Sequence, residues 1–425
     1  MRGGWNAVVF GLVGAAVFAS LAAAETTLKF MGWVALFDFQ KAGWSRMVAD
    51  FQTANPDMKI DYIGTPFEET LNQDMVAILG HNAPDIFQIS SGWVPQLQGI
   101  GGLAPLDGLF SADELAEFPK SMIESTSVDG KPYSLPWLPG PIVLTYNRTL
   151  MKEVGLDPDN PPKTWPELTA AAKKICALPE RDGGKVYGIA LRSARHFNSA
   201  QWAIPVIWGF GGHIVGADGK VDVDNSGAIA ALEWYRAMIG SGCSPDSFDI
   251  QETRNIFSQG RAGFIFEGPW VRGLVNNLSG GKLKVAPDGD VWVAPMPADP
   301  DGKVRSIANS NELAVSAQSR QKEAAAKFIR SILGNQPTVD YFYETSQQLT
   351  TGRLDILRSG KMGQDPYVQA FVAVLPESDG VPIKSPKWIA ALDILAPALQ
   401  SVIKGADAKS ELKQATRDIQ RALSR

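Results

Sequence analysis

Apolar and polar positions near the start of the chain follow two different periods. Short apolar runs at 28–31, 58–62 and 86–89 are typical of β-strands, and in the second run every other residue is apolar. Between the first two runs, apolar residues across 44–51 recur at i, i+3, i+4 and i+7, which predicts one face of a helix. The order strand, helix, strand predicts an α/β lobe whose helix covers a sheet.

Signals of the same kinds continue to the end of the chain. Thr164 and Glu167 have the spacing of a capping box, which predicts a helix over 170–178. The other signals are two tight-turn dipeptides at 129–130 and 218–219, a buried strand at 263–266, and helices at 322–333, from Pro386 onward and across 412–423. The sequence has no repeat and no low-complexity linker, so we expect ordered segments to join its parts.

The first 24 residues have the pattern of a secretory signal peptide. Arg2 precedes an apolar stretch over 7–18, and small residues end at Ala24. The stretch is short for a membrane anchor, which needs about 20 apolar residues. We therefore expect cleavage after Ala24 and a periplasmic protein.

Length and charge narrow the class of protein. The roughly 400 residues after the expected cleavage site exceed what one hydrophobic core usually organises, which predicts two lobes. Lysine and arginine total 40 against 45 aspartate and glutamate residues, without a long basic run. Nucleic acid and anionic membranes are therefore not expected as main partners.

The sequence contains few residues suited to redox or metal chemistry. Cys176 and Cys243 are its two cysteines, and both a disulfide and two buried thiols are open, because sequence does not give their separation. His81, His196 and His213 lack the spacing of metal ligands. We expect no metal and no cofactor.

Seven segments, in their order and spacing, resemble the extracellular solute-binding proteins of ABC sugar importers, the group that includes maltose-binding protein. The clearest are Ala-Pro-Asp-Ile-Phe at 83–87, Pro-Lys-Thr-Trp-Pro-Glu-Leu at 162–168 and Phe-Glu-Gly-Pro-Trp at 266–270. The others are 102–107, 129–137, 146–148 and 323–329. Together they span nearly the whole chain after the expected signal peptide.

The resemblance implies a two-lobed periplasmic-binding-protein fold of class α/β, in which each lobe is a sheet flanked by helices and a ligand cleft lies between the lobes. It implies an N-terminal lobe of 25–139 plus 307–336 and a C-terminal lobe of 140–306 plus 337–425. The chain is expected to cross between them near 139–143 and 306–313. The implied function is capture of a mono- or oligosaccharide by a monomer and its delivery to the membrane permease subunits of an ABC importer.

A sugar has apolar patches on its ring faces and a rim of hydroxyl groups, so its site needs flat aromatic walls and fixed polar side chains. The chain has 12 tryptophans, several at strand ends, where open α/β sheets bind ligands. In family members, sugar commonly stacks on the tryptophan that corresponds to Trp270. The expected ligand contacts are Trp33, Ser90, Ser91, Trp93, Trp137, Trp202, Glu267, Gly268, Trp270, Asn309, Asn311 and Trp388. For each tryptophan, burial in a lobe core is the alternative.

Other functions make different demands on the sequence. A glycoside hydrolase needs two carboxylates across the scissile bond, and no local motif proposes such a pair, so we expect no catalytic residues. A glycerol phosphate needs cationic side chains, for which Arg148, Arg261, Arg272 and Arg353 are available. A polyamine needs converging carboxylates, for which Glu68, Glu69 and Glu267 are available. A polyol is a further alternative.

Overall fold

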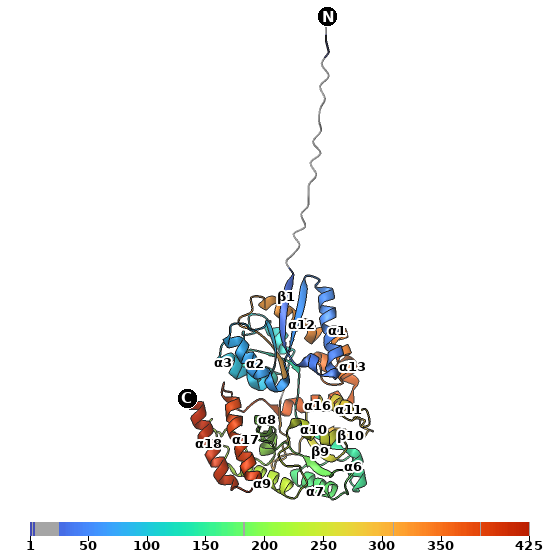
Figure 1. Cartoon of the computed structure of the whole chain (residues 1–425), viewed down its shortest axis with the longest axis vertical. Coiled ribbons are helices and arrows are strands. Elements are labelled where there is room, and N and C mark those ends of the chain that lie inside the picture. The colour runs from blue at the N-terminus through green and yellow to red at the C-terminus, as the bar shows by residue number, and fades with distance from the viewer. Residues whose placement is uncertain (2, 5–24, 182, 309, 383, 425) are drawn as a thin grey trace.

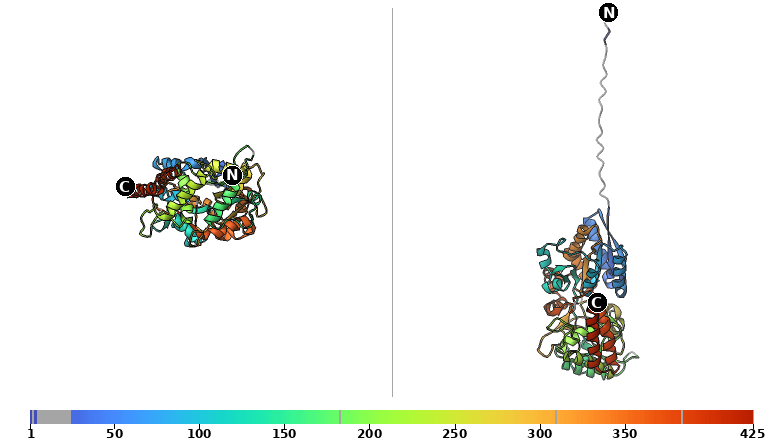
Figure 2. Two further views of the ribbon diagram at one scale, coloured as in Figure 1. Left: turned by 90° about the horizontal axis from the view of Figure 1, so that it is seen from below. Right: turned by 90° about the vertical axis from the view of Figure 1, so that its left-hand side faces the viewer.

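The computed structural model describes residues 1, 3–4, 25–181, 183–308, 310–382 and 384–424. Nearly all of the expected signal peptide, including its cleavage site, lies outside these residues. The chain from residue 25 onward forms two lobes stacked along the long axis of the molecule (Figures 1 and 2). Among the helices that the structure describes, none combines the length and the hydropathy that a membrane span needs.

A five-stranded sheet forms the centre of the first lobe. Its strand order is β2 (Met58–Gly64), β1 (Thr26–Gly32), β3 (Ile86–Ser90), β12 (Asn311–Val315) and β6 (Leu135–Leu138). β1 pairs in parallel with β2 and β3, whereas β12 runs antiparallel to β3 and β6. All five residues of β3 are buried, as expected for a strand covered on both faces.

Helices cover both faces of this sheet. Alternate residues of β3 belong to different cores, because successive side chains of a strand point to opposite faces. Ile86 packs with the apolar stripe of α1 (Asp38–Ala54) and with α12 (Lys322–Gly334), while Phe87 and Ile89 pack with α2 (Phe67–Leu79) and α3 (Val94–Gly99). The predicted stripe over 44–51 faces the sheet, and Trp44 lies 4.5 Å from Phe30 of β1, centroid to centroid.

The second lobe is built on a four-stranded sheet of order β10 (Val291–Ala294), β7 (Val143–Asn147), β9 (Ala262–Glu267) and β8 (Tyr187–Ala190). One face packs on α7 (Trp165–Cys176), α8 (Phe197–Gly209), α9 (Ser226–Gly240), α17 (Trp388–Ile403) and α18 (Ala408–Ser424). The other packs on α10 (Ile250–Ser258), α11 (Val271–Leu278) and α16 (Pro366–Val374). Thr164 and Glu167 form the predicted capping box of α7.

Short elements complete the two lobes. They are α4 (Ala112–Ala116), α5 (Lys120–Ser125), α6 (Arg148–Glu153), α14 (Leu354–Leu357), α15 (Gly360–Gln364) and the hairpin of β4 (Ser127–Val128) and β5 (Lys131–Pro132). The hairpin turns at the predicted dipeptide, where Asp129 and Gly130 both have positive φ. The helix expected from Pro386 begins two residues later, because Lys387 is its N-cap.

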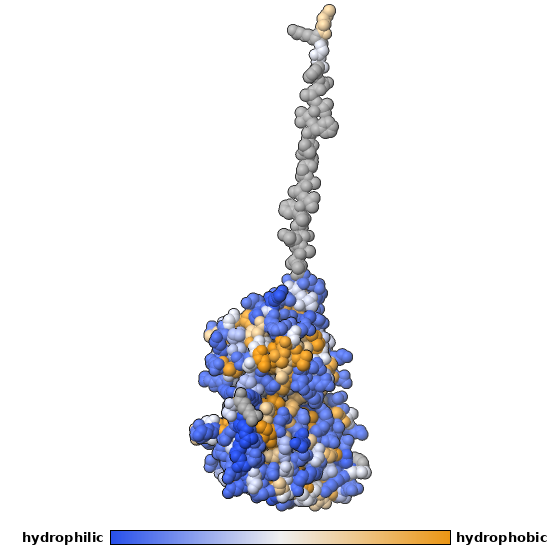
Figure 3. Space-filling view, turned by 60° about the vertical axis from the view of Figure 1, so that its left-hand side comes forward, coloured by the Kyte–Doolittle hydropathy of each residue, from blue (hydrophilic) through white to orange (hydrophobic). Residues whose placement is uncertain are grey.

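Two of the segments that connect the lobes are neighbours. The segment from β6 to β7 and the segment from β11 (Ser306–Ile307) to β12 lie side by side, joined by a bridge between Pro141 and Ala308. β11 also pairs in parallel with β13 (Ser378–Asp379). On the face drawn in Figure 3, hydrophobic residues gather on the first lobe and near the junction of the lobes, while most of the remaining surface is hydrophilic.

One boundary differs from the expectation. α13 (Gln336–Ser346) packs along α1 in the first lobe, although the expected boundary placed residues after 336 in the second. Phe342 joins the core of the first lobe, and Gly43 of α1 makes room for it, since a Cβ at Gly43 would lie 2.1 Å from Cδ2 of Phe342. Thr338 donates a hydrogen bond of 2.7 Å to Asp50 across the same contact. The first lobe therefore extends through α13.

Cys176 and Cys243 form a disulfide, with 5.2 Å between their Cα atoms. It ties the end of α7 to the segment after α9 in the second lobe. The question that the sequence left open is thus answered in favour of the bridge.

Because the bridge closes a loop with a sequence separation of 67, replacing both cysteines by alanine should lower the free energy of unfolding by about 2–4 kcal/mol. Urea denaturation with and without reductant measures this change, and reductant should destabilise the wild type but not the double variant. Two reactive thiols in the denatured, unreduced protein would contradict the assignment.

Candidate functional site

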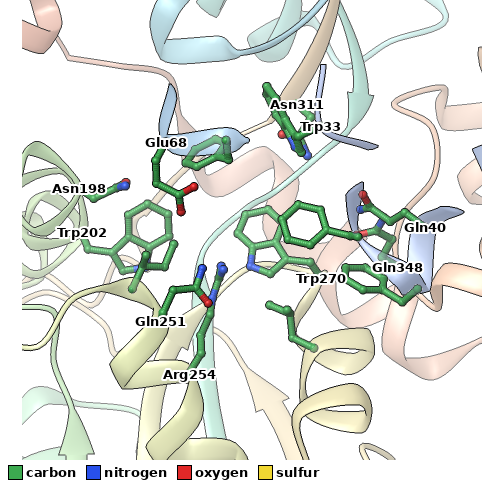
Figure 4. Close-up of a pocket in the computed structure, with 15 residues that line it drawn as sticks. Trp33, Gln40, Glu68, Asn198, Trp202, Gln251, Arg254, Trp270, Asn311 and Gln348 are labelled. Carbon is green, nitrogen blue, oxygen red and sulfur yellow. The ribbon is translucent and has the colours of Figure 1, made fainter. Parts of the chain in front are cut away.

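A cavity with about 630 Å³ of empty space, part of it open to solvent, lies between the lobes. The first lobe contributes Trp33, Phe37, Phe39, Gln40, Phe67, Glu68 and Asn311, the second contributes Asn198, Trp202, Ile250, Gln251, Arg254, Trp270 and Leu274, and Gln348 follows α13. Figure 4 shows aromatic and polar side chains of both lobes around the same space.

The lining residues gather where helices begin. Phe39 and Gln40 lie in the first turn of α1, and Phe67 and Glu68 open α2. In the second lobe, α8, α10 and α11 contribute residues from their first two turns. Most of these helices follow the carboxyl ends of strands β1, β2, β8 and β9, which is the edge where open α/β sheets bind ligands.

Glu267, the last residue of β9, is fully buried beneath the cavity. Its Oε1 lies 2.5 Å from Nη2 of Arg192 and 2.7 Å from Nε of Arg254, and its Oε2 lies 3.2 Å from Nη2 of Arg254. Oε2 also accepts a 2.5 Å hydrogen bond from Nε1 of Trp270. The carboxylate therefore fixes the indole of Trp270, and its pairs with two guanidinium groups leave the cluster with one net positive charge.

The network keeps its charges at neutral pH. Burial alone would raise the pKa of Glu267, but the nearby guanidinium groups of Arg254 and Arg192 and the hydrogen bonds from Arg254 and Trp270 outweigh it and lower the pKa to about 2. Burial lowers the pKa of Arg192 to about 10, partly offset by the charge of Glu267. Both groups thus remain ionised around pH 7.

The same network holds the indole ring of Trp202 in place. The guanidinium of Arg192 lies over its ring, 3.7 Å from the centroid, and its Nε1 donates a 3.0 Å hydrogen bond to the carbonyl of Phe266. The cation supports one face of the indole. Because Trp202 also lines the cavity, the indole can present an apolar surface to a ligand.

Aromatic packing and one buried glutamine build the wall of the first lobe. Trp33 contacts Phe67 and Trp93 with centroid distances of 5.1 and 5.7 Å. Oε1 of Gln88 on β3 accepts hydrogen bonds from the backbone N–H groups of Trp33, at 3.0 Å, and Val34, at 2.9 Å. Gln88 therefore fixes the turn that carries Trp33 to the cavity.

The structure brings four of the expected contact residues to the cavity, namely Trp33, Trp202, Trp270 and Asn311. Trp93 and Glu267 lie behind them. Gly268 makes room for the indole of Trp270, since a Cβ there would lie 2.5 Å from the ring atom Cη2. Ser90 and Ser91 are buried at the end of β3, and the backbone N–H of Ser91 donates to the carbonyl of Ser310. Asn309 lies outside the described residues.

Two expected contacts lie away from the cavity. Trp137 is fully buried in β6, where it packs on Phe30, Trp44 and Phe342 in the core of the first lobe. Trp388 begins α17 and is buried in the core of the second lobe. Packing in the lobe cores explains the positions of both indoles, so neither belongs to the candidate binding site.

The sequence analysis named Glu68 for polyamine binding alone. It did not name most of the other lining residues as sugar contacts, and these are Phe37, Phe39, Gln40, Phe67, Asn198, Ile250, Gln251, Arg254, Leu274 and Gln348. Except for Phe37, the N-cap of α1, and Gln348, which follows α13, these residues lie in the first two turns of a helix. Phe39 and Gln40 precede the stripe at 44–51, so the predicted helix start could have drawn attention to them. Gln348 has no comparable local signal, because its place depends on how α13 packs.

Across the described residues, no three histidine, cysteine, aspartate or glutamate side chains gather in a way that could hold a metal ion. Glu68 is the one carboxylate among the described residues that line the cavity. The arrangement offers aromatic faces, amide groups and one guanidinium to a ligand, which suits a neutral, hydroxyl-bearing molecule with apolar ring faces.

Comparison with known proteins gives consistent results. Residues 40–339 match the profile of the family described as bacterial extracellular solute-binding protein. A binding protein of Brucella abortus is 27% identical over 363 residues, which is 84% of this chain and 83% of that protein. The maltotriose-binding protein of Pyrococcus abyssi is 25% identical over 387 residues, covering 88% and 78%. The structure of an ABC transporter solute-binding protein from Thermotoga lettingae bound with α-D-tagatose shares the fold, with a TM-score of 0.82, 23% identity and coverage of 94% and 100%.

Replacing Glu267 by glutamine should lower the free energy of unfolding by about 3–5 kcal/mol, because two cations lose their buried counter-charge. The matched control is Glu233→Gln, which breaks a surface pair with Arg236 and should cost less than about 1 kcal/mol. Chemical denaturation followed by circular dichroism compares the two. Equal stability losses would show that the network does not support the site.

The buried carboxyl group of Glu312 on β12 should make the stability of the fold depend on pH. Burial raises its pKa to about 8 from an ordinary value of 4.5, with one partial offset, a 3.1 Å hydrogen bond from Ser134. Between these two pH values, the carboxyl group of Glu312 holds a proton in the folded chain that it has released in the unfolded chain. Its contribution to the free energy of unfolding is therefore complete below about pH 4.5 and is lost as the pH rises to about 8.

Glu312→Gln removes this titration. The variant should therefore gain stability relative to the wild type as the pH is raised from 5 to 9, by about 1 kcal/mol or more. Denaturant midpoints across this range measure the gain, with a substitution of an exposed glutamate, Glu323→Gln, as control. A difference that does not change with pH would contradict the assigned titration.

Proposed function

Because the chain belongs to the family of bacterial extracellular solute-binding proteins, we propose that it is exported to the periplasm, captures a carbohydrate between its lobes and delivers it to the permease subunits of an ABC importer. The observation that carries the carbohydrate assignment is the meeting of indoles from both lobes, Trp33 from one and Trp202 and Trp270 from the other, around one cavity. The signal-peptide pattern of residues 1–24 supports export.

The chemistry of the cavity suits a sugar. Indole faces pack against the apolar C–H faces of sugar rings, and amides such as those of Asn198, Gln251 and Asn311 can both donate to and accept from hydroxyl groups. The maltotriose-binding protein of Pyrococcus abyssi and the tagatose complex from Thermotoga lettingae support the same ligand class.

The arrangement of the lobes supports capture by closure. The two adjacent crossing segments, joined at Pro141 and Ala308, and the return of the chain after α13 form the connection about which the lobes can rotate. A ligand that contacts both lobes favours the closed state by its difference in affinity for the two states. The closed surface is then the form that the permease recognises.

The placement of charged groups disfavours the other ligands. Arg148, Arg261, Arg272 and Arg353 do not line the cavity, so a phosphate would meet one cation, Arg254, among the described lining residues, and Arg254 already pairs with Glu267. A polyamine finds one lining carboxylate, Glu68, in the described part of the site. A hydrolase requires a second carboxylate facing the first across a glycosidic bond.

Trp270→Ala should weaken binding of the preferred sugar about tenfold or more, equivalent to about 1.4 kcal/mol, because a ring loses its stacking surface. The measurements are a thermal-shift screen against sugars, polyols and glycerol 3-phosphate, followed by titration of tryptophan fluorescence with the best ligand.

The control for this experiment is Trp292→Phe, which changes a partly buried indole of β10 that does not line the cavity. It should bind as the wild type does. Unchanged affinity in Trp270→Ala would refute the stacking role, and stabilisation by glycerol 3-phosphate without any sugar would refute the carbohydrate assignment.

A further inference from the structure

Three buried amide side chains line the cavity and keep one polar atom without a partner. Asn198, Gln40 and Gln348 are 5%, 3% and 1% exposed. Within the described residues, Nδ2 of Asn198, Oε1 of Gln40 and Nε2 of Gln348 make no hydrogen bond. An unpaired buried polar group costs about 1–3 kcal/mol, so each of these amides gains from a partner that a ligand can supply.

The amides stand at opposite sides of the cavity. In Figure 4, Asn198 lies beside Trp202 at one side, Gln40 and Gln348 lie together at the other, and Trp270 lies between them. They also come from separate elements, since Asn198 begins α8, Gln40 begins α1 and Gln348 follows α13.

Each side also has its own apolar surface. Trp202, backed by Arg192, serves the side of Asn198. Phe39 precedes Gln40 and lies close to α11, since a Cβ at Gly273 would meet its ring at 2.9 Å. Phe37 lies 5.7 Å from Phe39, centroid to centroid. The cavity therefore repeats one pairing, an aromatic face with buried amides, on both sides of Trp270.

A sugar hydroxyl both donates and accepts, so it can satisfy either kind of open amide atom. The terminal torsion of an amide is broad, so a small rotation can turn its open atom toward a ligand. One ring stacked on one side, however, leaves the amides of the other side unpaired.

On the basis of the proposed function, we infer that the ligand is an oligosaccharide of at least two rings. One ring lies between Trp202 and Trp270 and contacts Asn198. The next ring lies beyond Trp270 and contacts Gln40 and Gln348. Monosaccharides and linear polyols fill one side and bind weakly.

Isothermal titration calorimetry of the mature chain tests the inference with glucose, galactose, fructose, mannitol, maltose, cellobiose, trehalose, lactose, sucrose and maltotriose. The tightest ligand should have two or more rings and should bind at least tenfold more tightly than any of its component monosaccharides. A monosaccharide or mannitol that binds as tightly as every oligosaccharide would overturn the inference while leaving the proposed function intact. Binding of none of these carbohydrates would instead reject the proposed function.

Variants then locate the second ring. Gln348→Leu should weaken binding of the best oligosaccharide at least tenfold and change monosaccharide binding less than twofold. Gln40→Leu, a second change on the same side of the cavity, should have the same two effects. Asn198→Leu should weaken the binding of both ligands. Gln73→Leu, on α2 and outside the cavity, is the matched control and should weaken neither. Equal losses for both ligands in Gln348→Leu and Gln40→Leu, or no loss for either, would contradict the assignment of two rings.

Discussion

The buried carboxylate of Glu267 organises the second lobe's side of the cavity. It binds Nε1 of Trp270 directly, and it pairs with Arg192, whose guanidinium lies against Trp202. Two indoles that face the ligand space are therefore fixed through one anion. Since a buried charge is tolerated only when it is paired, Arg192 and Arg254 are required to keep Glu267 ionised beneath the cavity.

The fold follows closely from the pattern of the sequence. The stripe over 44–51 predicts α1, and the run at 86–89 predicts β3, because local periodicity and burial agree at both places. The resemblance suggested crossings near 139–143 and 306–313 and a boundary at 336. The place of α13 beyond that boundary depends on the fit of Phe342 against Gly43, a tertiary contact without a local signal.

The site was less predictable than the fold. Position along the chain selected Trp33, Trp202 and Trp270, which line the cavity, but it also selected Trp137 and Trp388, because an indole on an apolar strand or helix can serve a core equally well. Apart from Asn311, the amides that line the cavity were missed because glutamine and asparagine are common on surfaces. Asn198, Gln40 and Gln348 stand out once the structure shows that they are buried and incompletely bonded.

A crystal structure of the protein with its preferred carbohydrate bound would test most directly whether one ligand is held between aromatic planes of two lobes. We expect a sugar ring on the face of Trp270, with contacts from Trp33 in one lobe and Trp202 in the other. A sugar bound to one lobe alone, or bound outside the space among these indoles, would contradict it.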